Sequence, residues 1–91
     1  MAKVIVKLYT TLKDRLGESS VILEGGSASD VIGALAAAKP GLDRLLLDEE
    51  GVLRAHFAVT LNSDLLDHRK MAQAKLKDGD VLHVFPPVSG G

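Results

Sequence analysis

The sequence has 91 residues, a length that suits one small domain better than two. Its apolar content of 46% is ordinary for a globular protein and argues against intrinsic disorder. Eleven Lys and Arg residues against twelve Asp and Glu residues give a net charge of −1, without the basic excess of nucleic-acid-binding proteins. The absence of cysteine excludes a disulfide scaffold, a thiolate metal site and a catalytic cysteine. Because no apolar run approaches about 20 residues and no signal-peptide pattern occurs, we expect a cytoplasmic protein that binds neither nucleic acid nor membrane.

The first 25 residues predict two strands joined by a short helical turn. Within residues 3–9, apolar side chains recur at every second position, which predicts a strand. Two leucines four residues apart then precede Gly17, a spacing typical of a short helix that ends at a glycine. Val21 and Leu23 alternate over a second strand. Because the connection is short, we expect the two strands to pair as a hairpin.

Residues 28–39 are predicted to form the main helix. Ser27 stands three residues before an aspartate, which resembles a capping box, and apolar residues follow at helical spacing. Pro40 and Gly41 end this pattern. Three leucines within residues 42–46 predict one further helical turn. Residues 48–51, Asp-Glu-Glu-Gly, have the composition of a solvated tight turn rather than of paired catalytic carboxylates.

The second half of the chain predicts a third strand over residues 57–61, a short edge strand at 65–66 and a last strand over 81–85. The order of strands and helix predicts an α+β fold, with a mixed sheet of four to five strands packed on one main helix. The predicted core consists of Val4, Val6, Leu8, Val21, Leu23, Val31, Leu35, Phe57, Val59, Leu61, Leu82 and Val84.

The common catalytic and metal-binding motifs do not occur in the sequence. The Gly25-Gly26 pair lacks the spacing of a phosphate loop, and no His-Glu-x-x-His motif is present. His56 and His83 are expected on the outward face of the sheet, as solvated residues rather than as metal ligands. We therefore predict no catalytic residue and no metal site on this chain.

The C-terminal segment carries the most specific signal. Two consecutive prolines stiffen the exit from the last strand and remove two backbone donors, so we expect a domain over residues 1–85 and a flexible tail over 86–91. The final two glycines have no Cβ, so the backbone there can pass through a constriction that any side chain would block. The residues predicted to enter a partner's site are Pro86, Pro87, Val88, Ser89 and Gly90, followed by Gly91.

This ending, Phe-Pro-Pro-Val-Ser-Gly-Gly, resembles that of ubiquitin-like sulfur carriers of the MoaD/ThiS kind, and most of all the MoaD kind. Residues 4–17 and the helix that begins at Ser27 also resemble that family. The resemblance implies a β-grasp fold. Residues 42–56 form a longer middle than compact MoaD proteins have, and in this they resemble carriers for cysteine synthesis and small archaeal modifiers.

The resemblance implies a non-catalytic carrier that binds no cofactor of its own. A ubiquitin-activating-type, MoeB-like enzyme would use ATP and magnesium to adenylate the carboxyl of Gly91, and sulfur transfer would then leave a thiocarboxylate. The sulfur acceptor would be the MoaE-like large subunit of molybdopterin synthase, or another acceptor enzyme. The alternatives are a protein modifier conjugated through Gly91, a sulfur carrier for cysteine, thiamin or tRNA thiolation, and a plain interaction module.

A partner-docking patch is expected on the outward face of the sheet. Tyr9 on the first strand and Phe85 on the last strand point away from the core in the predicted register, and Leu65 lies just beyond the third strand. Aromatic residues of this kind often dominate the energetics of an interface. We therefore predict that these three side chains contact the activating partner near the tail.

Overall fold

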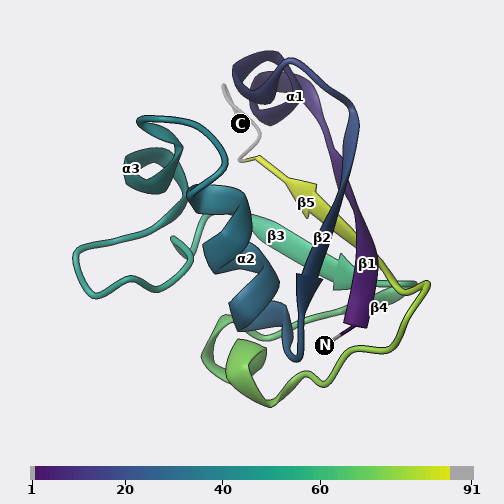
Figure 1. The fold of residues 1–91 in the computed structure, drawn as a ribbon. Helices are drawn as coiled ribbons and strands as arrows, with labels where there is room; N and C mark the ends of the chain where they lie inside the picture. Colours follow the sequence, from purple (N-terminus) through teal and green to yellow (C-terminus); the bar gives the residue numbers. More distant parts are fainter. Residues whose placement is uncertain (1, 87–91) are drawn as a thin grey trace.

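A five-stranded mixed sheet forms one layer of the structure, and the main helix α2 (Ala28–Ala36) packs across one of its faces (Figure 1). The computed structural model describes residues 2–86. Strands β1 and β5 run parallel at the centre, and the other neighbouring pairs are antiparallel, in the order β2-β1-β5-β3-β4. This arrangement confirms the predicted α+β architecture. The strands are β1 (Ala2–Leu8), β2 (Ser20–Gly25), β3 (Ala58–Leu61), β4 (Asp64–Leu65) and β5 (Val81–Phe85).

The hairpin of β1 and β2 is confirmed, and its connection contains helix α1 (Thr10–Leu16). Both leucines of this helix are buried. Gly17 ends the helix with a φ of 86°, a left-handed conformation that favours glycine, and its N–H donates to a carbonyl of the last turn at 2.8 Å. In the hairpin register Val6 lies opposite Val21.

Helix α2 begins as its sequence predicts and ends earlier. Ser27 is the N-cap, and its Oγ accepts a hydrogen bond from the Asp30 N–H at 3.3 Å. The predicted end at residue 39 is wrong, because the last turn tightens: the Ala38 N–H donates to the Leu35 carbonyl at 3.0 Å. Pro40 also disfavours a helical conformation for the residue before it, so the helix stops at Ala36.

The long connection between α2 and β3 contains helix α3 (Leu42–Leu46), followed by the predicted tight turn. Asp48 organises that turn, because its Oδ1 accepts hydrogen bonds from the backbone N–H groups of Glu50 at 2.9 Å and Val52 at 3.0 Å. An isolated β-bridge between Leu47 and Leu53 closes the loop at its base. The three acidic residues of the turn are exposed, as the composition predicts.

A 3₁₀ helix, η1 (His68–Gln73), lies in a segment for which the pattern predicts only polar residues. Asp67 caps it, since its Oδ1 accepts from the Arg69 N–H at 2.9 Å. Met71 is buried and packs on the side of α2, with which η1 is in contact. One buried residue in six gives no helical periodicity, so the sequence pattern does not reveal this element.

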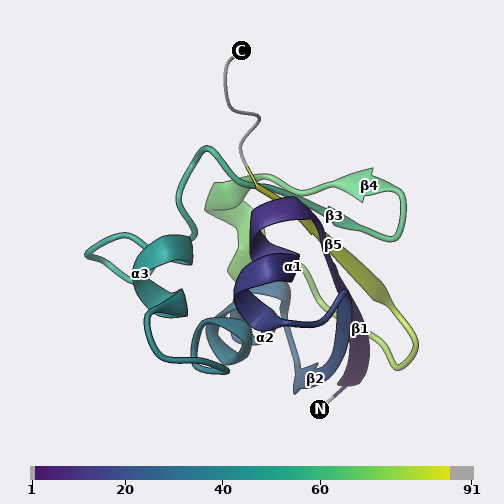
Figure 2. The same cartoon turned by 90° about the horizontal axis from the view of Figure 1, so that it is seen from above.

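The predicted core is confirmed except at Val21, Leu23 and Leu61, which are only half-buried. Val21 and Leu23 lie on the edge strand β2, which has no neighbouring strand on its outer side. Leu61 is paired on both sides, with Leu82 of β5 and with Asp64 of β4, but β4 is an edge strand of only two residues. Seen from above, α2 and α3 lie on one side of the sheet, and the other face carries no helix of residues 2–86 (Figure 2). Further buried residues are Leu12, Leu16, Ile32, Leu42, Leu46, Leu53 and Met71.

Candidate functional site

The last strand leads towards the tail at one end of the sheet. Strand β5 is parallel to β1 with Val84 beside Leu8, so Phe85 follows at the level of Tyr9. Pro86 continues from the strand without regular structure and is half-buried. The other predicted tail residues, Pro87, Val88, Ser89, Gly90 and Gly91, lie outside the described part of the chain.

Tyr9, Phe85 and His83 form an aromatic cluster on the helix-free face at this end of the sheet. The rings of Tyr9 and Phe85 are stacked, with centroids 4.7 Å apart and an interplanar angle of 13°. The His83 ring lies 6.0 Å from each of them, nearly parallel to both. A hydrogen bond of 2.7 Å joins the Tyr9 hydroxyl and His83 Nδ1. Phe85 still exposes 36% of its surface, so the cluster presents an apolar face to solvent.

Leu65 lies on the same face, apart from the aromatic cluster. The register pairs Thr60 with Leu65 on one side and with His83 on the other, so the three side chains form one row across the sheet. Leu65 is 72% exposed. The structure therefore brings Tyr9 and Phe85 into contact, and it places Leu65 two strands away from β5.

The expectation for the histidines is correct in one part and wrong in two. His83 does project from the outward face of β5, but it is half-buried and hydrogen-bonded to Tyr9 rather than solvated. His56 does not lie on the sheet: it occupies a turn before β3 and is exposed. The third strand begins only at Ala58, because residues 55 and 56 are used to turn the chain. The sequence signals for this cluster are the alternation of β1 and that of β5, which place Tyr9, His83 and Phe85 on the outward face.

A basic hollow adjoins the aromatic cluster. It has a volume of about 450 Å³, and its lining includes Lys7, Lys13 and Tyr9. Within residues 2–86 the one ion pair closer than 4.0 Å joins Arg69 and Asp67, so neither lysine has such a partner there. An acidic side chain of another protein could therefore approach both lysines beside the tail exit.

Thr10 makes the turn from β1 into α1 with a φ of 47°. A positive φ is uncommon for a β-branched residue, so this turn is strained. Tyr9 immediately before it is extended, with φ −132° and ψ 149°, which continues the direction of the strand. The strained turn thus lets Tyr9 stay beside Phe85 while the chain leaves the sheet.

The start of β5 is fixed by Asn62 and Asp80. The Asn62 side chain accepts from the Val81 N–H at 3.1 Å and donates to Asp80 Oδ1 at 3.2 Å. The Lys77 N–H donates to Asp80 Oδ2 at 2.8 Å. This backbone N–H, followed by the Asn62 amide, lowers the pKa of the Asp80 carboxyl below its usual value. The turn before β5 is thus held by a charged carboxylate.

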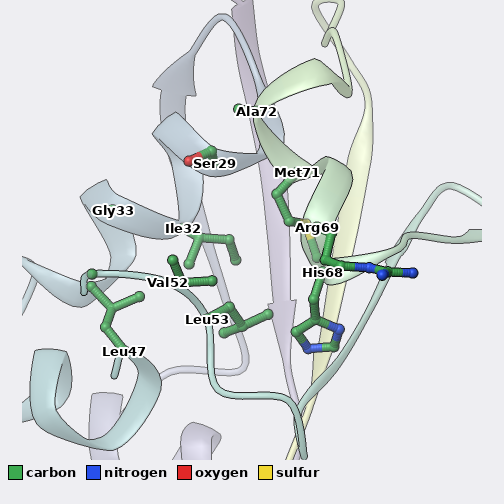
Figure 3. Close-up of a pocket in the computed structure, with 11 residues that line it drawn as sticks. Ser29, Ile32, Gly33, Leu47, Val52, Leu53, His68, Arg69, Met71 and Ala72 are labelled. Atoms are coloured by element: carbon green, nitrogen blue, oxygen red, sulfur yellow. The ribbon is translucent and has the colours of Figure 1, made fainter. Parts of the chain in front are cut away.

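A separate cavity of about 390 Å³ lies on the helix side of the molecule (Figure 3). Its lining is mainly apolar, with Ile32 of α2, Leu53 of the long connection and Met71 of η1 converging on it. His68 at its edge is already engaged, because its Nε2 lies 3.1 Å from the Arg54 carbonyl oxygen. The lining therefore offers no nucleophile paired with a base.

Between residues 2 and 86, no group of three or more His, Cys, Asp and Glu side chains is arranged to hold a metal ion. None of the helices in that range has the length and apolar character needed to cross a bilayer.

Residues 6–91 match the sequence model of the ThiS family, which covers the aromatic cluster, the tail exit and the final two glycines. The chain belongs to the ThiS family. A curated relative of similar length is small archaeal modifier protein 3 of Haloferax volcanii, which is 30% identical over 89 residues, covering 94% of this chain and 96% of that protein. The solution structure of small archaeal modifier protein 1 from Methanosarcina acetivorans has a TM-score of 0.86 at 31% identity, covering 100% of this chain and 98% of that one. These matches confirm the β-grasp fold.

Two of the similar solved structures are complexes with other proteins. One is the BexX/CysO complex of Amycolatopsis orientalis, with a TM-score of 0.81 at 30% identity, covering 97% of this chain and 99% of that one. The other is the complex of subunits 1 and 2 of the molybdopterin-converting factor of Helicobacter pylori, with a TM-score of 0.63 at 30% identity, covering 98% and 99%. This ThiS-family chain is therefore similar to small ubiquitin-like proteins that work as modifiers or with protein partners. The MoaD kind within the family is not distinguished by these matches.

Proposed function

We propose that this chain is a sulfur carrier whose Gly91 carboxyl is activated and converted to a thiocarboxylate. The observation that carries the proposal is the family match, which runs through residue 91 and so includes the Gly-Gly ending. The chain contains no cysteine, and the proposed chemistry needs none, because the carrying atom is added to the backbone carboxyl. The carrier itself is non-catalytic and binds no cofactor.

The proposed activation takes place on a ubiquitin-activating-type, MoeB-like enzyme. A carboxylate oxygen of Gly91 attacks the α-phosphorus of ATP, magnesium neutralises the phosphate charge, and pyrophosphate leaves. Hydrosulfide then attacks the carbonyl carbon of the acyl-adenylate: a carbon–sulfur bond forms, the carbon–oxygen bond to AMP breaks, and AMP leaves. Both glycines at the end serve this step, since the reacting atom must reach a confined site and be held closely there.

The aromatic cluster supplies the binding surface in this proposal. Gly91 lies six residues after Phe85, so a partner that holds Phe85 and Tyr9 has the reacting end within reach of an extended tail. The stack and the Tyr9–His83 hydrogen bond fix these rings before binding, which lowers the entropy lost on association. Lys7 and Lys13 in the adjacent hollow favour a partner with acidic side chains.

Three uses of the activated end are supported by different relatives. The similarity to subunits of a molybdopterin-converting factor supports sulfur donation to a MoaE-like large subunit in molybdopterin synthesis. The similarity to small archaeal modifier proteins equally supports conjugation, in which a lysine amine displaces AMP or sulfide and forms an isopeptide bond. The CysO match supports a third use, sulfur donation in cysteine synthesis.

The proposal is tested by incubating the chain with a MoeB-like enzyme, ATP, magnesium and sodium sulfide, and recording its intact mass. We expect the mass of one oxygen-to-sulfur exchange, dependent on ATP. Adding a residue after Gly91 serves as the matched variant, since it leaves residues 2–86 unchanged and displaces the reacting carboxyl; it should gain no sulfur. Equal sulfur gain by the extended variant would contradict the proposal. Addition of a cell lysate then separates the uses, because conjugates on other proteins indicate a modifier.

A further inference from the structure

Strand β2 leaves one edge of the sheet open. It is the first strand in the order β2-β1-β5-β3-β4, and Figure 2 shows it at one end of the sheet, with β4 at the other end. The Leu8 N–H donates to the Ser19 carbonyl at 2.9 Å, which fixes the phase of the antiparallel ladder. Alternate residues bond to β1, so the N–H and C=O groups of Ser20, Ile22 and Glu24 point away from the sheet. Within residues 2–86 these groups make no hydrogen bond outside the hairpin.

This edge carries apolar side chains on both faces. Ile22 projects from the helix-free face and is 70% exposed, whereas Val21 and Leu23 project inward and are only half-buried. Exposed edges of this kind are usually blunted by proline, by a bulge or by charges. β2 has no proline and carries one charge, Glu24. The edge is thus open to pairing with another strand.

We propose that two copies of this chain associate by pairing their β2 strands antiparallel about a two-fold axis at Ile22. In that register Ile22 lies opposite Ile22 of the second copy, so two exposed side chains cover each other. Val21 lies opposite Leu23 of the second copy, which completes the burial of both residues. Two of the predicted core residues that are only half-buried in the single chain, Val21 and Leu23, are thereby covered.

Charge complementarity favours a second copy as the occupant of the edge. The same register places Glu24 opposite Ser20 of the second copy. In the hairpin Lys3 lies beside Glu24, and Lys7 lies beside Ser20. Because Ser20 is short, the Glu24 carboxylate lies between Lys3 of its own chain and Lys7 of the second copy. No like charges are opposed across the axis, which is the arrangement that stabilises a cross-strand pair.

The dimer leaves the aromatic cluster and Leu65 free, whereas the basic hollow, whose lining includes Lys7 and Ser20, adjoins the paired edge. Tyr9 and Phe85 lie towards β5, and Leu65 lies on β4 at the opposite edge of the sheet from β2. Each copy thus keeps Tyr9, Phe85 and Leu65 free for docking, and the inference does not depend on the proposed function. Two six-residue strands bury less than the roughly 1,200 Å² of the smallest stable interfaces, so the dimer dissociates on dilution.

Disulfide crosslinking tests the register directly, because the native chain has no cysteine. Hydrogen-bonded antiparallel neighbours have Cα atoms about 5.5 Å apart, within the roughly 4.4–6.8 Å range of disulfides. Under mild oxidation Ile22→Cys should therefore form a covalent dimer at least about tenfold faster than Leu65→Cys. Leu65 is the matched control, since it is 72% exposed against 70% for Ile22 and lies on the other edge strand. Equal crosslinking rates would overturn the proposal.

Sedimentation velocity over a range of concentrations tests association without a crosslink. The wild type and Leu65→Lys should shift from monomer to dimer as concentration rises. Ile22→Lys should remain monomeric, because two ammonium groups would meet at the axis, while circular dichroism shows that the fold is kept. A wild type that stays monomeric up to about 1 mM, a concentration well above the dissociation constants expected for weak interfaces, would refute the dimer. The β2 edge would then be available to pair with a strand of another protein. Neither readout involves the tail, so failure here leaves the proposed function untouched.

Discussion

Replacing Phe85 by alanine separates the structural role of the aromatic cluster from its proposed docking role. Complete burial of a phenylalanine is worth about 3–5 kcal/mol against alanine. Phe85 is 36% exposed and stacks on Tyr9 at 4.7 Å, so we expect a loss of about 1.5–2.5 kcal/mol in the free energy of unfolding. Urea denaturation measures this loss. The fold should survive, because the side chain lies outside the buried core.

The binding effect of Phe85→Ala should exceed what its stability cost explains. If Phe85 anchors the partner, its truncation should cost at least about 2 kcal/mol of binding free energy, roughly a 30-fold rise in Kd for a MoeB-like enzyme. Isothermal titration calorimetry measures Kd with the folded variant. Ile22→Ala is the matched control on the same face, at the far edge strand, and should change Kd less than about twofold. A folded Phe85→Ala protein with full affinity would refute the docking surface.

Three further predictions concern stability. Asp80→Asn should lower the free energy of unfolding at neutral pH and flatten its decline in acid. The backbone N–H of Lys77 lowers the pKa of Asp80, so the carboxylate stabilises the fold above its unfolded pKa, and this stabilisation is lost as pH falls through the folded pKa, below about pH 4. Denaturation curves at several pH values measure the difference. Gly25→Ala should lower the free energy of unfolding by about 1–3 kcal/mol, because the new Cβ would lie 2.8 Å from Val31 Cγ2. Gly33→Ala is the control and should be tolerated, because a Cβ there meets nothing within 4 Å; thermal melts of both variants measure the difference. Leu35→Ala, at a fully buried position, should cost about 2–5 kcal/mol by urea denaturation, and a loss below 1 kcal/mol would contradict the assigned core.

Much of the fold follows from local patterns in the sequence. The alternation in β1 and β5 and the helical spacing of α2 predict both the elements and their buried faces, because the periods of 2 and 3.6 residues report directly which side chains share a face. The order of strands along a sheet is not a local property. Alternation therefore predicts the burial of Val4 correctly, but it overestimates the burial of Val21 and Leu23. Both lie on β2, and only the topology shows that β2 is an edge strand.

The candidate site could be predicted in part for the same reason. Phase along each strand places Tyr9 and Phe85 on the outward face, but their contact requires β1 and β5 to run parallel in one register. The hydrogen bond between Tyr9 and His83 depends on that register as well, so the sequence alone predicts a solvated histidine. The η1 helix escaped prediction because its one buried residue, Met71, gives no period.

The central claim, that the end of the chain carries the reacting group, is tested most directly at Gly90. Gly90→Leu should form no thiocarboxylate with a MoeB-like enzyme, ATP, magnesium and sulfide, because a side chain at this position would block entry to a site built for backbone. Gly33→Leu is the matched control, since a Cβ at Gly33 on α2 meets nothing within 4 Å outside its own helix, and it should gain sulfur as the wild type does. Intact mass spectrometry reads both outcomes. Sulfur gain by Gly90→Leu at the wild-type rate would contradict the account.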